Sequence, residues 1–197
     1  MDSDGSIIVV AAGTSADTGV VIRVNSGTGA QTVLASGHGL LNPIGVAVQG
    51  NGDILIADAG NYPVDGGVFR IDHSSGALTR LVSGAGFFAI LVSADGTTFV
   101  AGNDQVSMLD TSSGALTTIS AGGSLRSIFG LDAESSGKLV VADGEAGKVI
   151  RIDPSTGDQT TVASGNYLHY PLGIAVWPDT PLGAQLKTWG GIKARYR

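Results

Sequence analysis

Apolar and polar residues alternate in short runs along most of this chain, and the runs recur at a nearly constant interval. Four segments align with one another, and they begin at Val20, Gly67, Gln105 and Lys148. One position of the alignment is occupied by Arg23, Arg70, Met108 and Arg151. The intervals between these residues are 47, 38 and 43 positions. A period of about 40 to 50 residues is typical of the blades of β-propellers.

Each aligned segment predicts two β-strands joined by a turn that contains Ser or Thr followed by Gly. A shorter apolar run precedes each of them, at residues 7–10, 54–57, 98–101 and 139–142. Another run, rich in small and β-branched residues, precedes the later units, at residues 44–48, 89–92, 129–132 and 172–176. Small and β-branched residues suit an innermost strand that is crowded around an axis. The pattern therefore predicts four strands per unit.

Helical repeats and a β-helix are the main structural alternatives. A helical solenoid would need apolar residues at i, i+3 and i+4 and far fewer than the 31 glycines present. The rungs of a β-helix would be shorter than the observed period. We therefore expect an all-β chain, a β-propeller of four-stranded blades.

Three stretches carry a resemblance to a known family: residues 43–48, 52–61 and 68–72 together look like one NHL repeat. The resemblance spans about residues 2–177 and implies a propeller. It says less about function, since such propellers bind proteins, RNA or glycans, and related ones are lactonases or lyases. Two positions depart from the pattern, because Ala11 and Gly102 replace the Asp found elsewhere as Asp58 and Asp143.

The two ends of the repeat region are complementary half-units. The first unit begins at the turn before its second strand, and residues 172–176 supply only an innermost strand. Propellers often close by pairing such halves. One hypothesis is a closed four-bladed ring in which residues 172–176 pair with residues 7–11. The other is an incomplete part of a larger propeller, truncated or completed by a second chain as a homodimer.

Charge and composition limit the classes of partner and the kinds of site that we expect. The net charge is −6 with a pI of about 4.8, which disfavours nucleic-acid binding by the body of the protein. No apolar run approaches the roughly 20 residues of a membrane-spanning helix, and the acidic start shows no export signal. The chain has no cysteine, so disulfides and thiolate metal sites are ruled out.

Basic residues gather at the C-terminus, in residues 178–197. We expect a propeller domain over residues 1–177 and a separate tail, which is either an exposed solvated segment or an attachment segment. The ending from Thr188 to Arg197 resembles basic, aromatic tails of some bacterial extracellular proteins. This resemblance favours an extracellular or periplasmic location, while nothing else in the sequence decides the compartment.

Candidate binding residues follow from propeller topology, because the strand 2–3 and strand 4–1 loops emerge on one face. The candidates on that face are His38, Tyr62, Arg126, Tyr167, His169 and Tyr170. Aromatic groups on a rigid scaffold supply contact area at small entropic cost. We therefore expect a non-enzymatic module that binds a protein, peptide or glycan. Within the last of these loops, Leu168 aligns with Leu40 and is predicted to be its packing residue.

An enzymatic alternative uses the acidic and amide groups of the same face. A Ca²⁺ ion could be held near the axis by Asp58, Asn103, Asp143 and Glu145, as a lactonase-like hydrolase or lyase would require. Ala11 removes one member of that ring, and an Asp after a strand commonly hydrogen-bonds its own loop. No nucleophile elbow, phosphate-binding loop or zincin motif is present.

The arginine column has a structural interpretation. Arg23, Arg70 and Arg151 are predicted mid-strand, where pairing with carboxylates such as Asp72 and Asp153 is expected.

Overall fold

The computed structural model describes residues 5–13, 18–61 and 66–177, and these residues form fifteen β-strands without a helix. The strands belong to four antiparallel sheets, here called blades one to four in chain order. The predicted all-β class is therefore confirmed, and so are the predicted strands except residues 172–176, which form no strand here. Tyr62 and the basic tail lie outside the described residues.

Blade one has three strands, and the other blades have four. Blade one consists of β1 (Ile7–Ala11), β2 (Val20–Val24) and β3 (Gln31–Ser36). Blade two consists of β4 (Pro43–Val48), β5 (Ile54–Asp58), β6 (Gly67–Ile71) and β7 (Leu78–Ser83). Blade three consists of β8 (Ala89–Val92), β9 (Thr98–Gly102), β10 (Gln105–Leu109) and β11 (Leu116–Ala121). Blade four consists of β12 (Ile128–Ala133), β13 (Leu139–Asp143), β14 (Lys148–Ile152) and β15 (Gln159–Ser164).

Local chemistry explains why the turns fall where they do. The turn before each second strand contains a glycine with positive φ, at Gly5, Gly52, Gly96 and Gly137. Between the third and fourth strands, the side chain of Asp72 accepts hydrogen bonds from the backbone N–H groups of Ser74 and Ser75, at 3.1 and 2.8 Å. Asp110 makes the same kind of turn, and hydrogen bonds from Ser112 and Ser113 lower its pKa to about 2.

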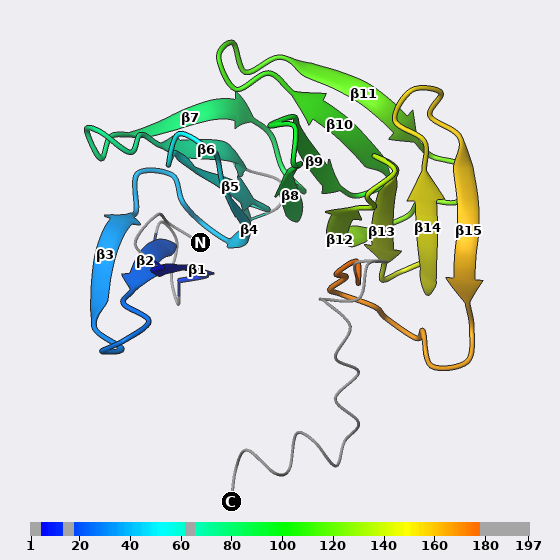
Figure 1. Cartoon of the computed structure of the whole chain (residues 1–197), viewed down its shortest axis with the longest axis horizontal. Coiled ribbons are helices and arrows are strands. Elements are labelled where there is room, and N and C mark those ends of the chain that lie inside the picture. Colours follow the sequence, from blue (N-terminus) through cyan, green and yellow to red (C-terminus); the bar gives the residue numbers. More distant parts are fainter. Residues whose placement is uncertain (1–4, 14–17, 62–65, 178–197) are drawn as a thin grey trace, which may run out of the picture.

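The blades follow one another along an open arc, with β4, β8 and β12 on its inner side (Figure 1). The core lies between blades. One apolar cluster joins blades one and two and includes Val21 and Phe69, a second joins blades two and three, and a third joins blades three and four. Each blade therefore buries its faces against its sequence neighbours, as stacked repeats do.

The arc is not closed, so the structure has the form of part of a larger ring. Strand β1 pairs with β2, and within the described residues nothing pairs with its other edge. The closing pairing of residues 172–176 with residues 7–11 is therefore wrong for this structure. Residues 172–176 instead lie against β12: Gly130 faces the carbonyl oxygen of Leu172 and the N–H of Ile174, just as Gly45 faces Phe88 and Ile90. They occupy the place of the next innermost strand.

The predicted partners of the arginine column need correction. Arg151 pairs with Glu134, with Nη2 to Oε1 at 2.6 Å and Nε to Oε2 at 3.0 Å, rather than with Asp153. Arg70 donates to the backbone oxygen of Thr111 at 3.4 Å, rather than to Asp72. In the turns, Ser74 Oγ donates to Asp72 and Ser155 Oγ donates to Asp153, whose Oδ2 lies 3.7 Å from Lys138 Nζ.

No helix among the described residues is long and apolar enough to cross a membrane.

Candidate functional site

Asp58 ends the second strand of blade two and is fully buried. Its carboxylate accepts a hydrogen bond from the N–H of Gly60 in its own loop at 2.8 Å. It also accepts hydrogen bonds from the N–H groups of Leu41 at 2.8 Å and Asn42 at 3.1 Å, which belong to the loop entering the blade. The carboxylate therefore joins two loops that are distant in sequence.

Asp143 repeats this arrangement in blade four. It is fully buried and accepts hydrogen bonds from the N–H groups of Arg126 at 2.6 Å, Ser127 at 3.1 Å and Ala146 at 2.9 Å. The expected bond to its own loop is present in both blades, and the bonds to the incoming loop were not predicted. Buried charges are normally paired or fully hydrogen-bonded, and backbone N–H groups do this here.

Blade three replaces this carboxylate with Gly102. A side chain at this position would overlap the carbonyl oxygen of Gly86, because the entering loop has moved into the vacated space. The loop between the second and third strands is also reduced to a two-residue turn, Asn103–Asp104. Asn103 has φ of 46°, in the left-handed region that Asn tolerates better than most residues. The loop edge of blade three therefore differs from that of its neighbours.

The predicted binding residues that the structure describes occupy the loops between blades and the loop after β15. His38 lies in the loop entering blade two, with Nδ1 at 3.0 Å from the backbone oxygen of Ser36. The Arg126 guanidinium donates to the backbone oxygens of Gly123 and Leu125 at 3.0 and 2.7 Å. Tyr167 is 98% exposed, and His169 is also exposed.

Leu168 packs less completely than its counterparts. It makes the same turn as Leu40 and Leu125, whose side chains are fully buried, but Leu168 itself is half-buried.

Tyr170 is the candidate that joins a cluster. Its ring is tilted on that of Phe129, with centroids 5.5 Å apart, and Phe129 stacks on Phe88 at 4.9 Å. These three side chains are called the aromatic cluster below. Gly144 lies beneath it, because a Cβ there would come within 2.9 Å of Phe129 and 3.1 Å of Tyr170. Geometry of this kind contributes about 0.5–1.5 kcal/mol per pair beyond burial.

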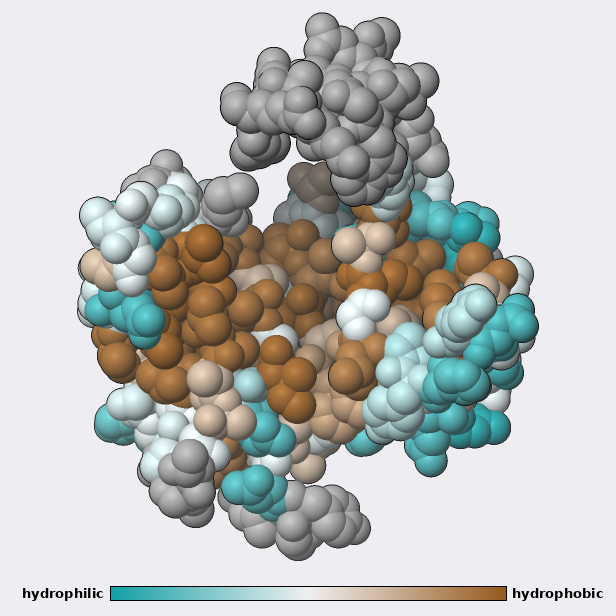
Figure 2. All heavy atoms as spheres, turned by 90° about the horizontal axis from the view of Figure 1, so that it is seen from below, coloured by the Kyte–Doolittle hydropathy of each residue, from teal (hydrophilic) through white to brown (hydrophobic). Residues whose placement is uncertain are grey.

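Sequence reasoning missed Phe88 and Phe129. The available signal was positional: each immediately precedes the aligned Ala or Gly of an innermost strand, at the same place as Ile44 and Leu172. Ile44 and Leu172 are 42% and 56% exposed, and the aromatic rings between them are half-buried. Viewed from below, the inner side of the arc is largely hydrophobic (Figure 2).

The four proposed metal-ligating residues come from three blades. Asp58, Asn103 and Asp143 belong to blades two, three and four. Glu145 is exposed and lines a surface hollow together with Arg126 and Lys148. Among the described residues, no three His, Cys, Asp or Glu side chains form a group that could hold a metal ion. A calcium site at these four residues stays a prediction.

Solved structures with the same architecture have little sequence identity to this chain. A chain of a nidogen/laminin complex matches with 15% identity and a TM-score of 0.67, over 84% of this chain and 62% of that one. A streptogramin B lyase matches with 14% identity and a TM-score of 0.64, over 87% and 55%. TolB from Acinetobacter baumannii matches with 16% identity and a TM-score of 0.60, over 81% and 41%.

These likenesses bear on the fold and not on the activity. This chain spans less than two thirds of the length of each of these structures. No family model and no curated protein matches the sequence, so the finer resemblance to NHL repeats stays a prediction. The neighbours are β-propeller proteins, and together with the four-sheet arc they show that this chain has a β-propeller fold.

Proposed function

We propose that this chain is a non-enzymatic binding module that recognises a protein or peptide through the loop face carrying the aromatic cluster. The supporting observation is the cluster itself: Phe88, Phe129 and Tyr170 come from successive units, stack on one another and keep exposed surface. Aromatic side chains held rigidly at a surface are typical anchors of protein interfaces. Exposed apolar neighbours at Ile44 and Leu172 extend the surface along the inner side of the arc.

The rigidity of the cluster follows from the strands that carry it. Phe129 lies within β12, and Phe88 directly precedes β8, with its N–H bonded to the Ala101 oxygen at 2.9 Å. Tyr170 gains its position from contact with Phe129. A partner that covers these rings therefore loses little entropy in ordering them, which favours affinity.

The enzymatic alternative has less support. A metal-assisted hydrolase or lyase would use the oxygens of Asp58 and Asp143, which here accept three backbone hydrogen bonds each within their own blades. One neighbour is a lyase and another comes from a nidogen/laminin complex, but identities of 14–15% transfer only the fold. The choice between the two functions rests on the aromatic cluster.

The test uses two tyrosines of the same loop. Peptides selected from a random displayed library against the full chain are measured by titration with the parent protein, Tyr170→Ala and Tyr167→Ala. We expect Tyr170→Ala to weaken binding at least about tenfold, as loss of an interface anchor does. Tyr167 is 98% exposed and is not part of the aromatic cluster, so Tyr167→Ala should change Kd less than Tyr170→Ala does.

Two outcomes contradict the proposal. Either no selected peptide binds with a measurable Kd, or the selected peptides bind Tyr170→Ala as well as they bind the parent protein. Thermal unfolding of both variants provides the control for folding.

A further inference from the structure

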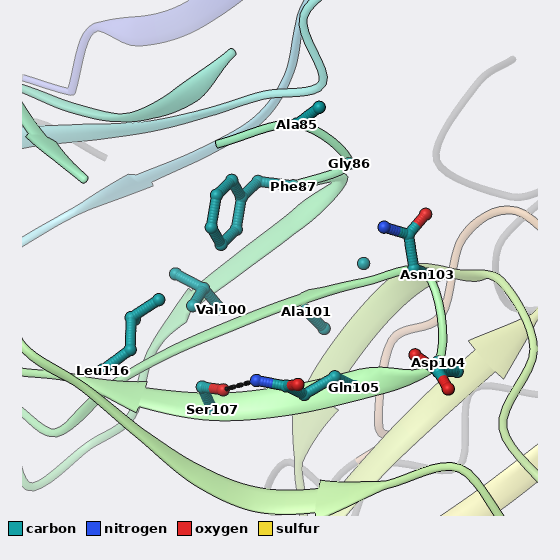
Figure 3. Close-up of a pocket in the computed structure, with 11 residues that line it drawn as sticks. Ala85, Gly86, Phe87, Val100, Ala101, Asn103, Asp104, Gln105, Ser107 and Leu116 are labelled. Atoms are coloured by element: carbon teal, nitrogen blue, oxygen red, sulfur yellow. Dashed lines mark hydrogen bonds between the residues drawn. The ribbon is translucent and has the colours of Figure 1, made fainter. Parts of the chain in front are cut away.

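A pocket of about 170 Å³ lies between blade three and the segment that enters it (Figure 3). Its apolar wall is formed by Phe87, Val100 and Leu116. Its polar wall is formed by Asn103, Asp104, Gln105 and Ser107. Phe87 faces this pocket, while its chain neighbour Phe88 stacks in the aromatic cluster, so the two sites are distinct.

The pocket lies where a small residue, Ser107, stands at a core position that holds a large apolar side chain in the other blades. Ser107 is the third residue of its strand and pairs with Val100. The same position holds Ile22, Phe69 and Ile150 in the other blades, paired with Val9, Ile56 and Val141. Phe69 and Ile150 are almost completely buried, and so is Ser107, at 2% exposure. A serine where the fold supports a large apolar residue leaves space and places a hydroxyl beside it.

That hydroxyl belongs to a small polar network. The amide Nε2 of Gln105 donates to Ser107 Oγ at 2.7 Å and to Thr118 Oγ1 at 3.1 Å. Among the described residues, the Gln105 Oε1 atom accepts no hydrogen bond, so it remains an acceptor for a ligand. Buried polar groups without a structural need cost stability, and a simple apolar residue would serve packing better here.

The open end of the pocket is also specific to this blade. The amide group of Asn103 lies directly over Gly86, where a Cβ would overlap it. The next turn residue, Asp104, is exposed and contributes a carboxylate to the rim. In blades two and four, the loops after Asp58 and Asp143 are longer in sequence, and these carboxylates accept hydrogen bonds from the N–H groups of Gly60 and Ala146.

The volume of the pocket and the polarity of its walls together indicate the class of ligand. The volume is below the roughly 300–1,000 Å³ of drug-sized sites, and it is close to the cavity of about 150 Å³ that accommodates benzene. One six-membered ring therefore fits. The polar wall favours a hydroxylated ring over an apolar one, because hydroxyl groups can donate to Gln105 Oε1 and to the Asp104 carboxylate and can accept from the Asn103 amide. We propose that the blade-three pocket binds one pyranose ring, with its C–H face on Phe87 and its hydroxyls on the polar wall.

The experiment is a titration of the full chain with pyranose sugars. Glucose, galactose, mannose and N-acetylglucosamine are added singly, and backbone amide shifts are followed by NMR. A ligand this small in an open pocket should bind with Kd on the order of millimolar. We expect saturable shifts at residues 86–87 and 100–107 with at least one sugar. Cyclohexane-1,2-diol, which is a less hydroxylated ring, should bind at least about fivefold more weakly.

Ser107→Ile is the decisive variant, because it restores the residue type of blade four and fills the pocket. It should keep or raise the melting temperature and weaken sugar binding at least about tenfold. Thr79→Ile makes a similar change at an exposed position of β7 in blade two and should bind like the parent protein. If Ser107→Ile does not fold, Gln105→Lys, again the blade-four residue, replaces it with the same expectation.

Three results would overturn the proposal: no sugar shifts these amides, Ser107→Ile binds sugar as the parent does, or the diol binds as tightly as the sugars. None of these results depends on peptide binding at the aromatic cluster, so the two proposals can fail separately.

Discussion

Blades two and four carry a buried carboxylate at the end of their second strand, and blade three carries Gly102 there. In the first pair, Asp58 and Asp143 tie the entering loop to the loop that follows them. In blade three, the entering loop fills the vacated space and a two-residue turn replaces the longer loop. All three blades nevertheless keep the same four-strand order. The strand order therefore follows from the packing of the repeats. The conformation of the loops at the end of the second strand depends on whether that strand ends in Asp or in Gly.

The largest expected effect comes from removing a carboxylate. Asp58→Ala leaves the N–H groups of Leu41, Asn42 and Gly60 buried or half-buried without their acceptor. Such losses cost about 1–3 kcal/mol per group, so we expect the free energy of unfolding to fall by about 3–5 kcal/mol. Urea unfolding followed by circular dichroism measures it.

Asp72→Ala is the matched control, because Asp72 caps an exposed turn. The comparison between blades fails if both variants lose the same stability, or if Asp58→Ala unfolds at the parent's urea midpoint.

A second variant tests whether blade three can adopt the loop arrangement of blades two and four. Gly102→Asp restores the residue of blades two and four, but its Cβ would overlap the Gly86 carbonyl. Overpacking of this kind costs about 1–3 kcal/mol, and Gly102→Ala should lose a similar amount because the Cβ causes the collision. Thermal unfolding measures both variants. A stabilised Gly102→Asp would instead show that the entering loop can move back and accept the carboxylate.

The smallest effect concerns an acid of blade four that lies at the surface. Hydrogen bonds from Arg151 lower the pKa of Glu134, so this pair stabilises the fold above the ordinary Glu pKa of about 4.3. The contribution is lost as pH falls through the lowered pKa. Glu134→Gln should reduce the melting temperature at pH 7 by a few degrees at most, since surface ion pairs contribute little.

The melting temperatures of Glu134→Gln and the parent protein should converge as pH falls below the ordinary Glu range. A difference that persists unchanged at low pH would mean that packing, and not charge, distinguishes the Glu134→Gln variant from the parent.

The sequence by itself predicted the strands, the four units and the column of Asp58 and Asp143. These features are local or periodic: alternation marks strands, glycines mark turns, and alignment marks equivalent positions. The bond of each aspartate to its own loop was predictable for the same reason. Even the serine at position 107 could have been found, since it interrupts an apolar column shared with Ile22, Phe69 and Ile150.

The tertiary structure alone decided how distant groups meet. Arg151 pairs with Glu134, which directly follows the innermost strand β12, and not with Asp153 of its own segment, a choice that no spacing in the sequence reveals. Phe88, Phe129 and Tyr170 come together because successive innermost strands lie side by side, so their contact depends on the angle between blades. Packing between blades also determines that the arc is open. The complementary half-units would permit closure, but residues 172–176 pack on β12, at the opposite end of the arc from β1 (Figure 1). Alternation along a strand determines which face is buried, and only packing between sheets determines what that face meets.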